Sequence, residues 1–129
     1  MKFLLDTHIF LWFIDANPKL SSSARQLIED PVNERLLSVA SLWEMSIKAS
    51  IGKLRLALTF PEMVENHVDG NAIELLHVGP EHPETVRTLP FHHKDPFDRL
   101  IIAQSQSENI PVLSQDEIFD EYAGVQRIG

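Results

Sequence analysis

Short apolar segments alternate with helix-forming segments along this chain, and that alternation constrains the fold more than any other feature. Residues 3–5, 35–39, 72–78 and 110–113 are apolar runs of strand length, and residues 125–128 can add a last edge strand. Strands that alternate with helices favour a parallel sheet covered by helices on both faces. We therefore predict an α/β fold with three layers (α/β/α) and a central, mainly parallel sheet.

Capping residues, prolines and glycines mark the predicted helices. Asp95 followed by Pro96 is the clearest start, because aspartate caps a helix and proline suits its first position. Ser41 is the predicted cap of another helix, which runs to about Ser50 and ends near Gly52. The other predicted helices cover residues 9–16, 21–30, 61–68 and 83–89.

The composition restricts the chemistry and the number of domains. With 129 residues and no repeat or Gly/Ser-rich linker, the chain fits a single domain, residues 1–129. It has no cysteine, which excludes disulfides, zinc–thiolate sites and thiol nucleophiles. A net charge of −8 argues against non-specific coating of DNA, but an acidic metal site would itself contribute several of these charges.

The N-terminal segment superficially resembles a signal peptide, because Lys2 is followed by apolar residues as far as Ile14. Asp6 and His8 interrupt that stretch, and no run approaches the ~18 apolar residues that a membrane span requires. We expect a soluble, cytoplasmic protein without membrane association.

Acidic residues follow the predicted strands or begin the predicted helices. Asp6 comes directly after the first strand, Asp116 follows residues 110–113, and Glu44 is expected in the first turn of the helix after the second strand. Asp95 and Asp98 begin another helix at i, i+3 spacing. Because ligands of open parallel sheets bind at the carboxyl ends of the strands, these acids are expected at one rim.

Each acid also has a simpler explanation. Asp95 can be only a helix cap, and Glu44 can form an ordinary i, i+4 ion pair with Lys48. Asp6 is harder to explain, since it lies between apolar runs where an unpaired carboxylate is costly.

Clustered carboxylates need a compensating charge. Two of them ~4 Å apart repel by about 4 kcal/mol at an effective dielectric near 20, a large part of a typical stability of ~5–15 kcal/mol. Either the acids lie apart or a cation holds them together. All-oxygen ligands favour hard ions such as Mg²⁺ or Mn²⁺.

Four short blocks, in this order, resemble the PIN-domain nucleases, and more narrowly the VapC toxins of bacterial toxin–antitoxin pairs. The blocks are Leu5-Asp6-Thr7, Ser41-Leu42-Trp43-Glu44 with Lys48, Asp95-Pro96-Phe97-Asp98-Arg99-Leu100, and Leu113-Ser114-Gln115-Asp116. The resemblance extends from Lys2 to about Tyr122.

The resemblance implies metal-dependent hydrolysis of RNA phosphodiester bonds by an activated water. It assigns Asp6, Glu44, Asp98 and Asp116 as catalytic residues and metal ligands, with Asp95 as a further candidate ligand. Thr7 and Ser114 are expected to support the ligands, and Lys48 and Arg99 are the leading candidates for phosphate contacts, ahead of Lys53, Arg55 and Lys94. Mg²⁺ or Mn²⁺ is the implied cofactor, and the implied partners are RNA, a VapB-type antitoxin and a second copy of the chain.

Two other classes of function compete with this hypothesis: another Mg²⁺-dependent α/β protein that acts on phosphate groups, and a non-catalytic interaction module. A haloacid-dehalogenase-type phosphatase would carry Asp-x-Asp after its first strand, but His8 occupies the third position here. A phospho-acceptor receiver domain also fits poorly, because residues 35–39 run into Ala40 and Ser41 rather than an acceptor aspartate. A non-catalytic interaction module with the same fold would use the acidic rim to bind a basic partner.

The histidines and tryptophans are given no chemical role by their spacing. None of the six histidines shows metal-ligand spacing, so we expect surface or packing roles, with His8 worth attention as a neighbour of Asp6. Trp12 and Trp43 lie within apolar patterns and are expected in the core.

Overall fold

The computed structural model describes all residues from Met1 to Gly129 and confirms the predicted α/β architecture. Its sheet has five strands in the order β3-β2-β1-β4-β5, and every neighbouring pair is parallel. The chain starts in the middle of the sheet, winds to one edge and then returns to the other side of β1. The strands are β1 (Lys2–Leu5), β2 (Glu34–Ser38), β3 (Glu74–Leu76), β4 (Val112–Leu113) and β5 (Arg127–Ile128).

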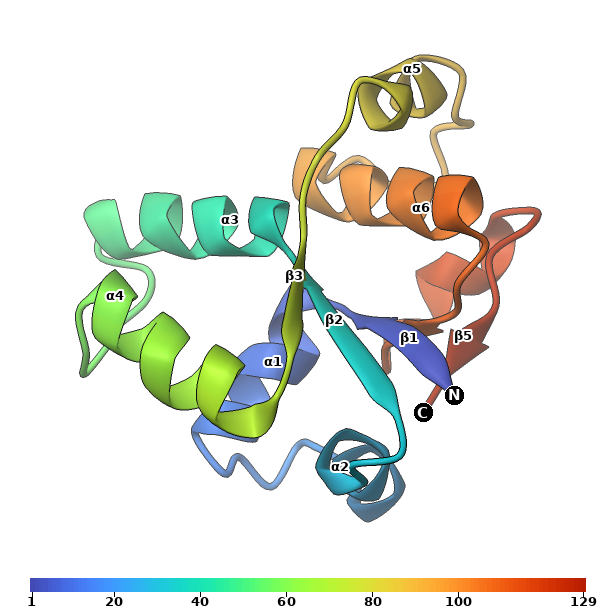
Figure 1. The fold of residues 1–129 in the computed structure, drawn as a ribbon. Coiled ribbons are helices and arrows are strands. Elements are labelled where there is room, and N and C mark those ends of the chain that lie inside the picture. The colour runs from blue at the N-terminus through green and yellow to red at the C-terminus, as the bar shows by residue number, and fades with distance from the viewer.

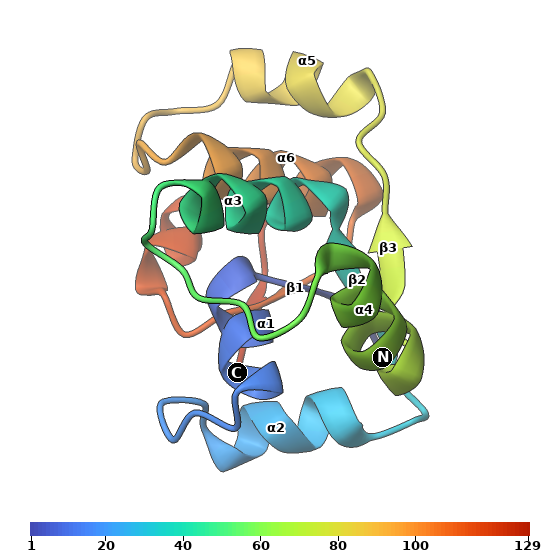
Figure 2. The same ribbon diagram turned by 90° about the vertical axis from the view of Figure 1, so that its left-hand side faces the viewer.

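Helices cover both faces of this sheet. In Figures 1 and 2, α3, α5 and α6 lie on one side of the strands, and α1, α2 and α4 lie on the other. None of the helices is both long and apolar enough to cross a membrane. The helices are α1 (Thr7–Ile14), α2 (Ser22–Glu29), α3 (Val39–Ser50), α4 (Phe60–Met63, continued by a wider turn over Val64–Val68), α5 (Glu81–Arg87) and α6 (Pro96–Glu108).

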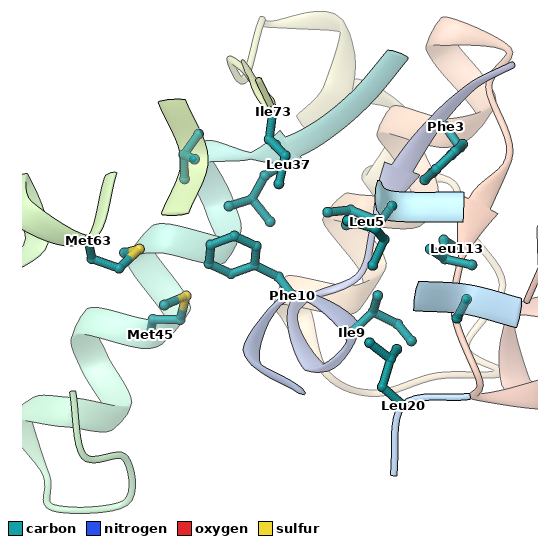
Figure 3. Packing of buried hydrophobic residues seen from close by; sticks show 13 residues of the cluster. Phe3, Leu5, Ile9, Phe10, Leu20, Leu37, Met45, Met63, Ile73 and Leu113 are labelled. Atoms are coloured by element: carbon teal, nitrogen blue, oxygen red, sulfur yellow. The ribbon is translucent and has the colours of Figure 1, made fainter. Parts of the chain in front are cut away.

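Alternate residues of each strand face the two helical layers, as the two-residue period of a strand requires. In β1, Phe3 and Leu5 belong to the core cluster on the side of α1 and α2, whereas Leu4 belongs to the cluster beneath α6. Phe10 of α1 fills the first cluster, and Figure 3 shows its ring pointing toward Met45. The central strands are therefore buried on both faces, as strands of a parallel sheet usually are.

Several predicted boundaries were wrong, and the largest differences are at α3 and β3. Helix α3 begins at Val39 and is capped by Ser38, whose hydroxyl accepts a hydrogen bond from the Ala40 N–H at 3.1 Å. Ser41 is therefore not the cap, and Glu44 lies in the second helical turn rather than the first. The strand expected over residues 72–78 is limited to Glu74–Leu76 at the sheet edge, where only β2 pairs with it.

Candidate metal centre

Asp6 and Asp116 follow β1 and β4, the neighbouring strands between which the strand order reverses. Asp6 Oδ1 accepts a hydrogen bond from the Ile9 N–H at 2.7 Å, so this acid also caps α1. The Ser114 hydroxyl donates to Asp6 Oδ2 and accepts from the Asp116 N–H at 3.0 Å. Ser114 thus links the two strand ends through these hydrogen bonds.

An open cleft of about 330 Å³ lies at this reversal point. Its walls are Asp6, His8, Trp12, Gln115 and Asp116. Trp12 packs against the core as predicted, yet its side chain also lines the cleft beside His8, with the two ring centroids 6.0 Å apart. Parallel sheets bind their ligands at such a position.

Glu44 comes to the same region from α3 and is only 2% exposed. Its Oε2 accepts a hydrogen bond from Lys48 Nζ at 2.7 Å, so the expected pair exists but is not a surface pair. Its Oε1 is buried and has no hydrogen-bond partner. An unpartnered buried carboxylate oxygen is costly, and a cation would supply what this oxygen lacks.

Asp95 and Asp98 come from the start of α6. Asp95 Oδ1 accepts hydrogen bonds from the N–H groups of Phe97 and Asp98, which confirms its role as the helix cap. The Asp98 side chain is 13% exposed, and its Oδ2 lies 2.9 Å from His93 Nε2. Burial, and then the negative charges of the surrounding acids, raise the pKa of Asp98 to about 8; these acids are Asp95, Asp6, Glu44 and Asp116.

Burial also raises the pKa of Asp6, against the opposing effect of its hydrogen bond from Ser114. The negative charge of Asp116 raises it further. Acids from three other chain segments therefore act on the ionisation of Asp98, as groups that share one electrostatic environment do.

The acidic side chains of this centre lie farther apart than the ligands around a bound metal ion do. No three of them have ligand oxygens that all lie within 4.8 Å of one another.

A tighter group, Glu81, His82 and Glu108, joins α5 to the far end of α6. Glu108 is ten positions along α6 from Asp98, which corresponds to about 15 Å. His82 Nδ1 accepts a hydrogen bond from the Gly79 N–H at 3.0 Å, and His82 Nε2 lies 3.2 Å from Glu108 Oε1. Both ring nitrogens already have partners, so this group is a structural contact between helices.

The donor set of the acidic centre fits a hard divalent cation, since it offers carboxylate oxygens and one of them is buried without a partner. Asp6, Glu44, Asp98 and Asp116 are the residues that could hold Mg²⁺ or Mn²⁺. Asp95 is a further candidate ligand, and its Oδ1 accepts two N–H bonds as the cap of α6.

Other residues expected at the site have different contacts. Thr7 donates its hydroxyl to Ser41 at 2.9 Å and touches no acid through it, so it links α1 to α3. Arg99 is 5% exposed and donates to the main-chain carbonyls of four residues, Val86, Leu89, Pro90 and His93. That geometry turns Arg99 away from the RNA contact we expected of it. Lys48 keeps partial exposure beside Glu44.

Two expectations about aromatic and imidazole side chains need correction. Trp43 is not a core residue but is 61% exposed, and it meets Phe97 edge to face at a centroid distance of 5.2 Å. His93, which we expected at the surface or in packing, contacts Asp98 and lies 4.0 Å from Asp116. Its place two residues before Asp95 was the one sequence signal that could have found it.

Fold and site together define an α/β domain with an acidic centre at the reversal point of a parallel sheet. The PIN domain family model matches residues 3–125, and the chain belongs to the PIN domain family. This confirms the resemblance seen in the sequence. PIN domains are generally nucleases, hydrolases of phosphodiester bonds.

Solved structures with the same fold are distant in sequence. VapBC2 from Rickettsia felis, bound to a DNA fragment from its promoter, matches with a TM-score of 0.69 and 16% identity over 99% of this chain and 98% of that one. DNA-bound VapBC from Salmonella typhimurium matches with a TM-score of 0.65 and 18% identity over 99% and 97%. No curated protein sequence matches this chain.

Proposed function

We propose that this protein is a Mg²⁺- or Mn²⁺-dependent endoribonuclease and the toxin of a VapBC-type toxin–antitoxin pair. The observation that carries the proposal is the acidic centre, in which Glu44 Oε1 is buried without a partner and the pKa of Asp98 is raised to about 8. A bound divalent cation would give the buried Glu44 oxygen a partner and would offset the repulsion among the clustered carboxylates. Membership of the PIN domain family supports phosphodiester hydrolysis as the reaction.

Asp6, Glu44, Asp98 and Asp116 are the proposed ligands and catalytic residues. A divalent cation supplies Lewis-acid activation of a water and neutralises charge that develops on the scissile phosphate. Ser114 holds the Asp6 carboxylate and the Asp116 main chain in register. Lys48 balances part of the negative charge at Glu44 and has enough exposure to reach an RNA phosphate.

The likeness to the two VapBC structures supports a VapB-type antitoxin as partner. An apolar groove of about 140 Å³ beside α1, walled by Leu11, Ile14, Leu56 and Met63 among others, offers surface that a small protein partner could cover. The proposal also includes a homodimer, a single domain over residues 1–129, and action in the cytoplasm, where RNA is accessible.

RNA cleavage with controlled metal tests this function. Purified protein incubated with total RNA should produce discrete cuts with Mn²⁺ or Mg²⁺ and none with EDTA, and mapping the new ends would identify the cleaved sites. Glu44→Gln is the matched control, because it keeps the shape of the side chain but removes its charge, and it should lose at least about 100-fold in rate. Metal-independent cleavage, or equal cleavage by the variant, would contradict the proposed centre. An absence of cleavage in any metal would favour the non-catalytic interaction module.

A further inference from the structure

His93 is built into the acidic centre although the proposed chemistry gives it no role. Its Nε2 lies 2.9 Å from Asp98 Oδ2 and 4.0 Å from Asp116 Oδ2, so this one nitrogen is close to acids from two chain segments. Its neighbour His92 is exposed and packs edge to face on Tyr122 instead. The two adjacent histidines therefore have different surroundings.

The hydrogen bonds of the ring specify which nitrogen carries the proton. His93 Nδ1 lies 3.2 Å from the main-chain nitrogen of Asp95 and accepts its N–H. In the neutral ring the proton must then be on Nε2, because one nitrogen accepts and the other donates. The nitrogen that carries the proton, Nε2, lies 2.9 Å from Asp98 Oδ2, and a nitrogen that carries a proton cannot also ligate a metal ion.

The main chain around His93 is held from two directions. The Tyr122 hydroxyl accepts from the His93 N–H at 2.8 Å and donates to the Pro90 carbonyl at 2.9 Å. The buried Arg99 guanidinium donates to the carbonyls of Pro90 and His93 at 2.8 and 3.2 Å. Such anchoring places the ring at a defined position and fits a residue whose task is to orient another.

We propose that His93 is a positioning residue that orients Asp98 for the divalent cation, because its close contact with Oδ2 leaves Oδ1 free to bind metal. This inference rests on the proposed metal-dependent function. Hydrogen bonds that orient metal ligands commonly contribute 10- to 100-fold to metal affinity. His93 would thus act on metal binding and touch neither metal nor RNA.

Two amide substitutions separate this role from a merely structural one. Glutamine can place its side-chain N–H₂ where histidine has Nε2, whereas the shorter asparagine reaches only the position of Nδ1. We expect His93→Asn to weaken Mn²⁺ binding, measured by isothermal titration calorimetry, by about 10- to 100-fold. His93→Gln and the matched control His92→Gln should stay within about threefold of the parent, and excess Mn²⁺ should restore RNA cleavage by His93→Asn.

Equal losses of Mn²⁺ affinity in His93→Gln and His93→Asn would overturn the role of His93. Parent-like Mn²⁺ affinity in His93→Asn would overturn it too. Neither result would contradict the proposed metal centre. A parent that binds no Mn²⁺ would overturn the proposed function and this inference with it. A measurement that needs no variant is ¹⁵N NMR of the imidazole rings at pH 7.5. We expect the His93 proton on Nε2 without metal and with saturating Mg²⁺, and a proton on Nδ1 would overturn the inference.

Discussion

Individual acids of this centre make ordinary structural contacts in addition to lying in the acidic cluster. Asp6 and Asp95 cap helices with one carboxylate oxygen, and Glu44 pairs with Lys48 through one oxygen while its other oxygen has no partner. Capping and ion pairing, which were the simple alternatives for these residues, are therefore present together with the acidic cluster. A carboxylate has enough lone pairs to accept such a hydrogen bond and still bind a further partner.

Asp95 and Asp98 should differ sharply when each is changed to its amide. Asparagine is as good a helix cap as aspartate, so Asp95→Asn keeps the start of α6 and should retain RNA cleavage within about tenfold of the parent. Asp98→Asn removes the carboxylate that the other acids surround and should lower the rate by at least about 100-fold. Single-turnover cleavage at saturating Mn²⁺ measures both. An inactive Asp95→Asn beside an active Asp98→Asn would reverse the assignment.

At the scale of elements, one buried arginine side chain, that of Arg99, holds the segment between α5 and α6 in place through hydrogen bonds. Arg99 of α6 donates to main-chain carbonyls at residues 86, 89, 90 and 93, and its guanidinium lies 4.1 Å from the centre of the Phe91 ring. These contacts hold the segment that carries His93 against the helix that carries Asp98.

Lysine cannot reproduce this fork of donors, although it keeps the charge. Arg99→Lys should lower the free energy of unfolding by about 2 kcal/mol, since several buried carbonyls lose their partners. It should also speed hydrogen exchange at the His93 N–H. Urea unfolding and exchange monitored by NMR measure these effects, with the exposed Arg87→Lys as the matched control. Parent-like stability of Arg99→Lys would contradict the anchoring role.

The start of α6 was predictable because Asp95 is a single cap followed by Pro96. At α2 the three consecutive serines 21–23 all offered a cap, and Ser21 is the one that the structure uses. At α3 two serines compete, and Ser38 caps because β2 ends there, while Ser41 is drawn into a contact with Thr7 from α1. The role of Arg99 was not predictable, because it depends on the path of a distant loop. Local sequence does not encode such contacts.

At the scale of the whole molecule, the parallel sheet and the gathering of acids follow from residues at strand ends, so both could be expected from the sequence. The exposure of Trp43 could not be predicted from the sequence. Trp43 occupies an apolar pattern, but it lies on a helix face that no other segment of the chain covers completely. The position of His93 could not be predicted either. Hydrogen bonds between its main chain and the side chains of Tyr122 and Arg99 hold it at the centre, and only the folded chain brings these residues together.

The raised pKa of Asp98 makes the stability of the metal-free protein depend on pH. The folded chain keeps a proton on Asp98 up to about pH 8, whereas the unfolded chain releases it near the ordinary value of 3.8. Stability from this site is therefore complete below about pH 4 and is lost as pH rises through about 8. The loss is at most about 1.4 kcal/mol per pH unit for one proton.

Urea unfolding of the parent and of Asp98→Asn between pH 5 and pH 8, with EDTA and then with Mn²⁺, tests the shared metal centre most directly. Without metal, the parent should lose stability steadily as pH rises, and the variant should lose much less. At pH 7.5, Mn²⁺ at 100 times its dissociation constant should stabilise the parent by about 2.7 kcal/mol and the variant far less. A parent whose stability is independent of pH in this range, with no response to Mn²⁺, would contradict the claim that these acids share a cation.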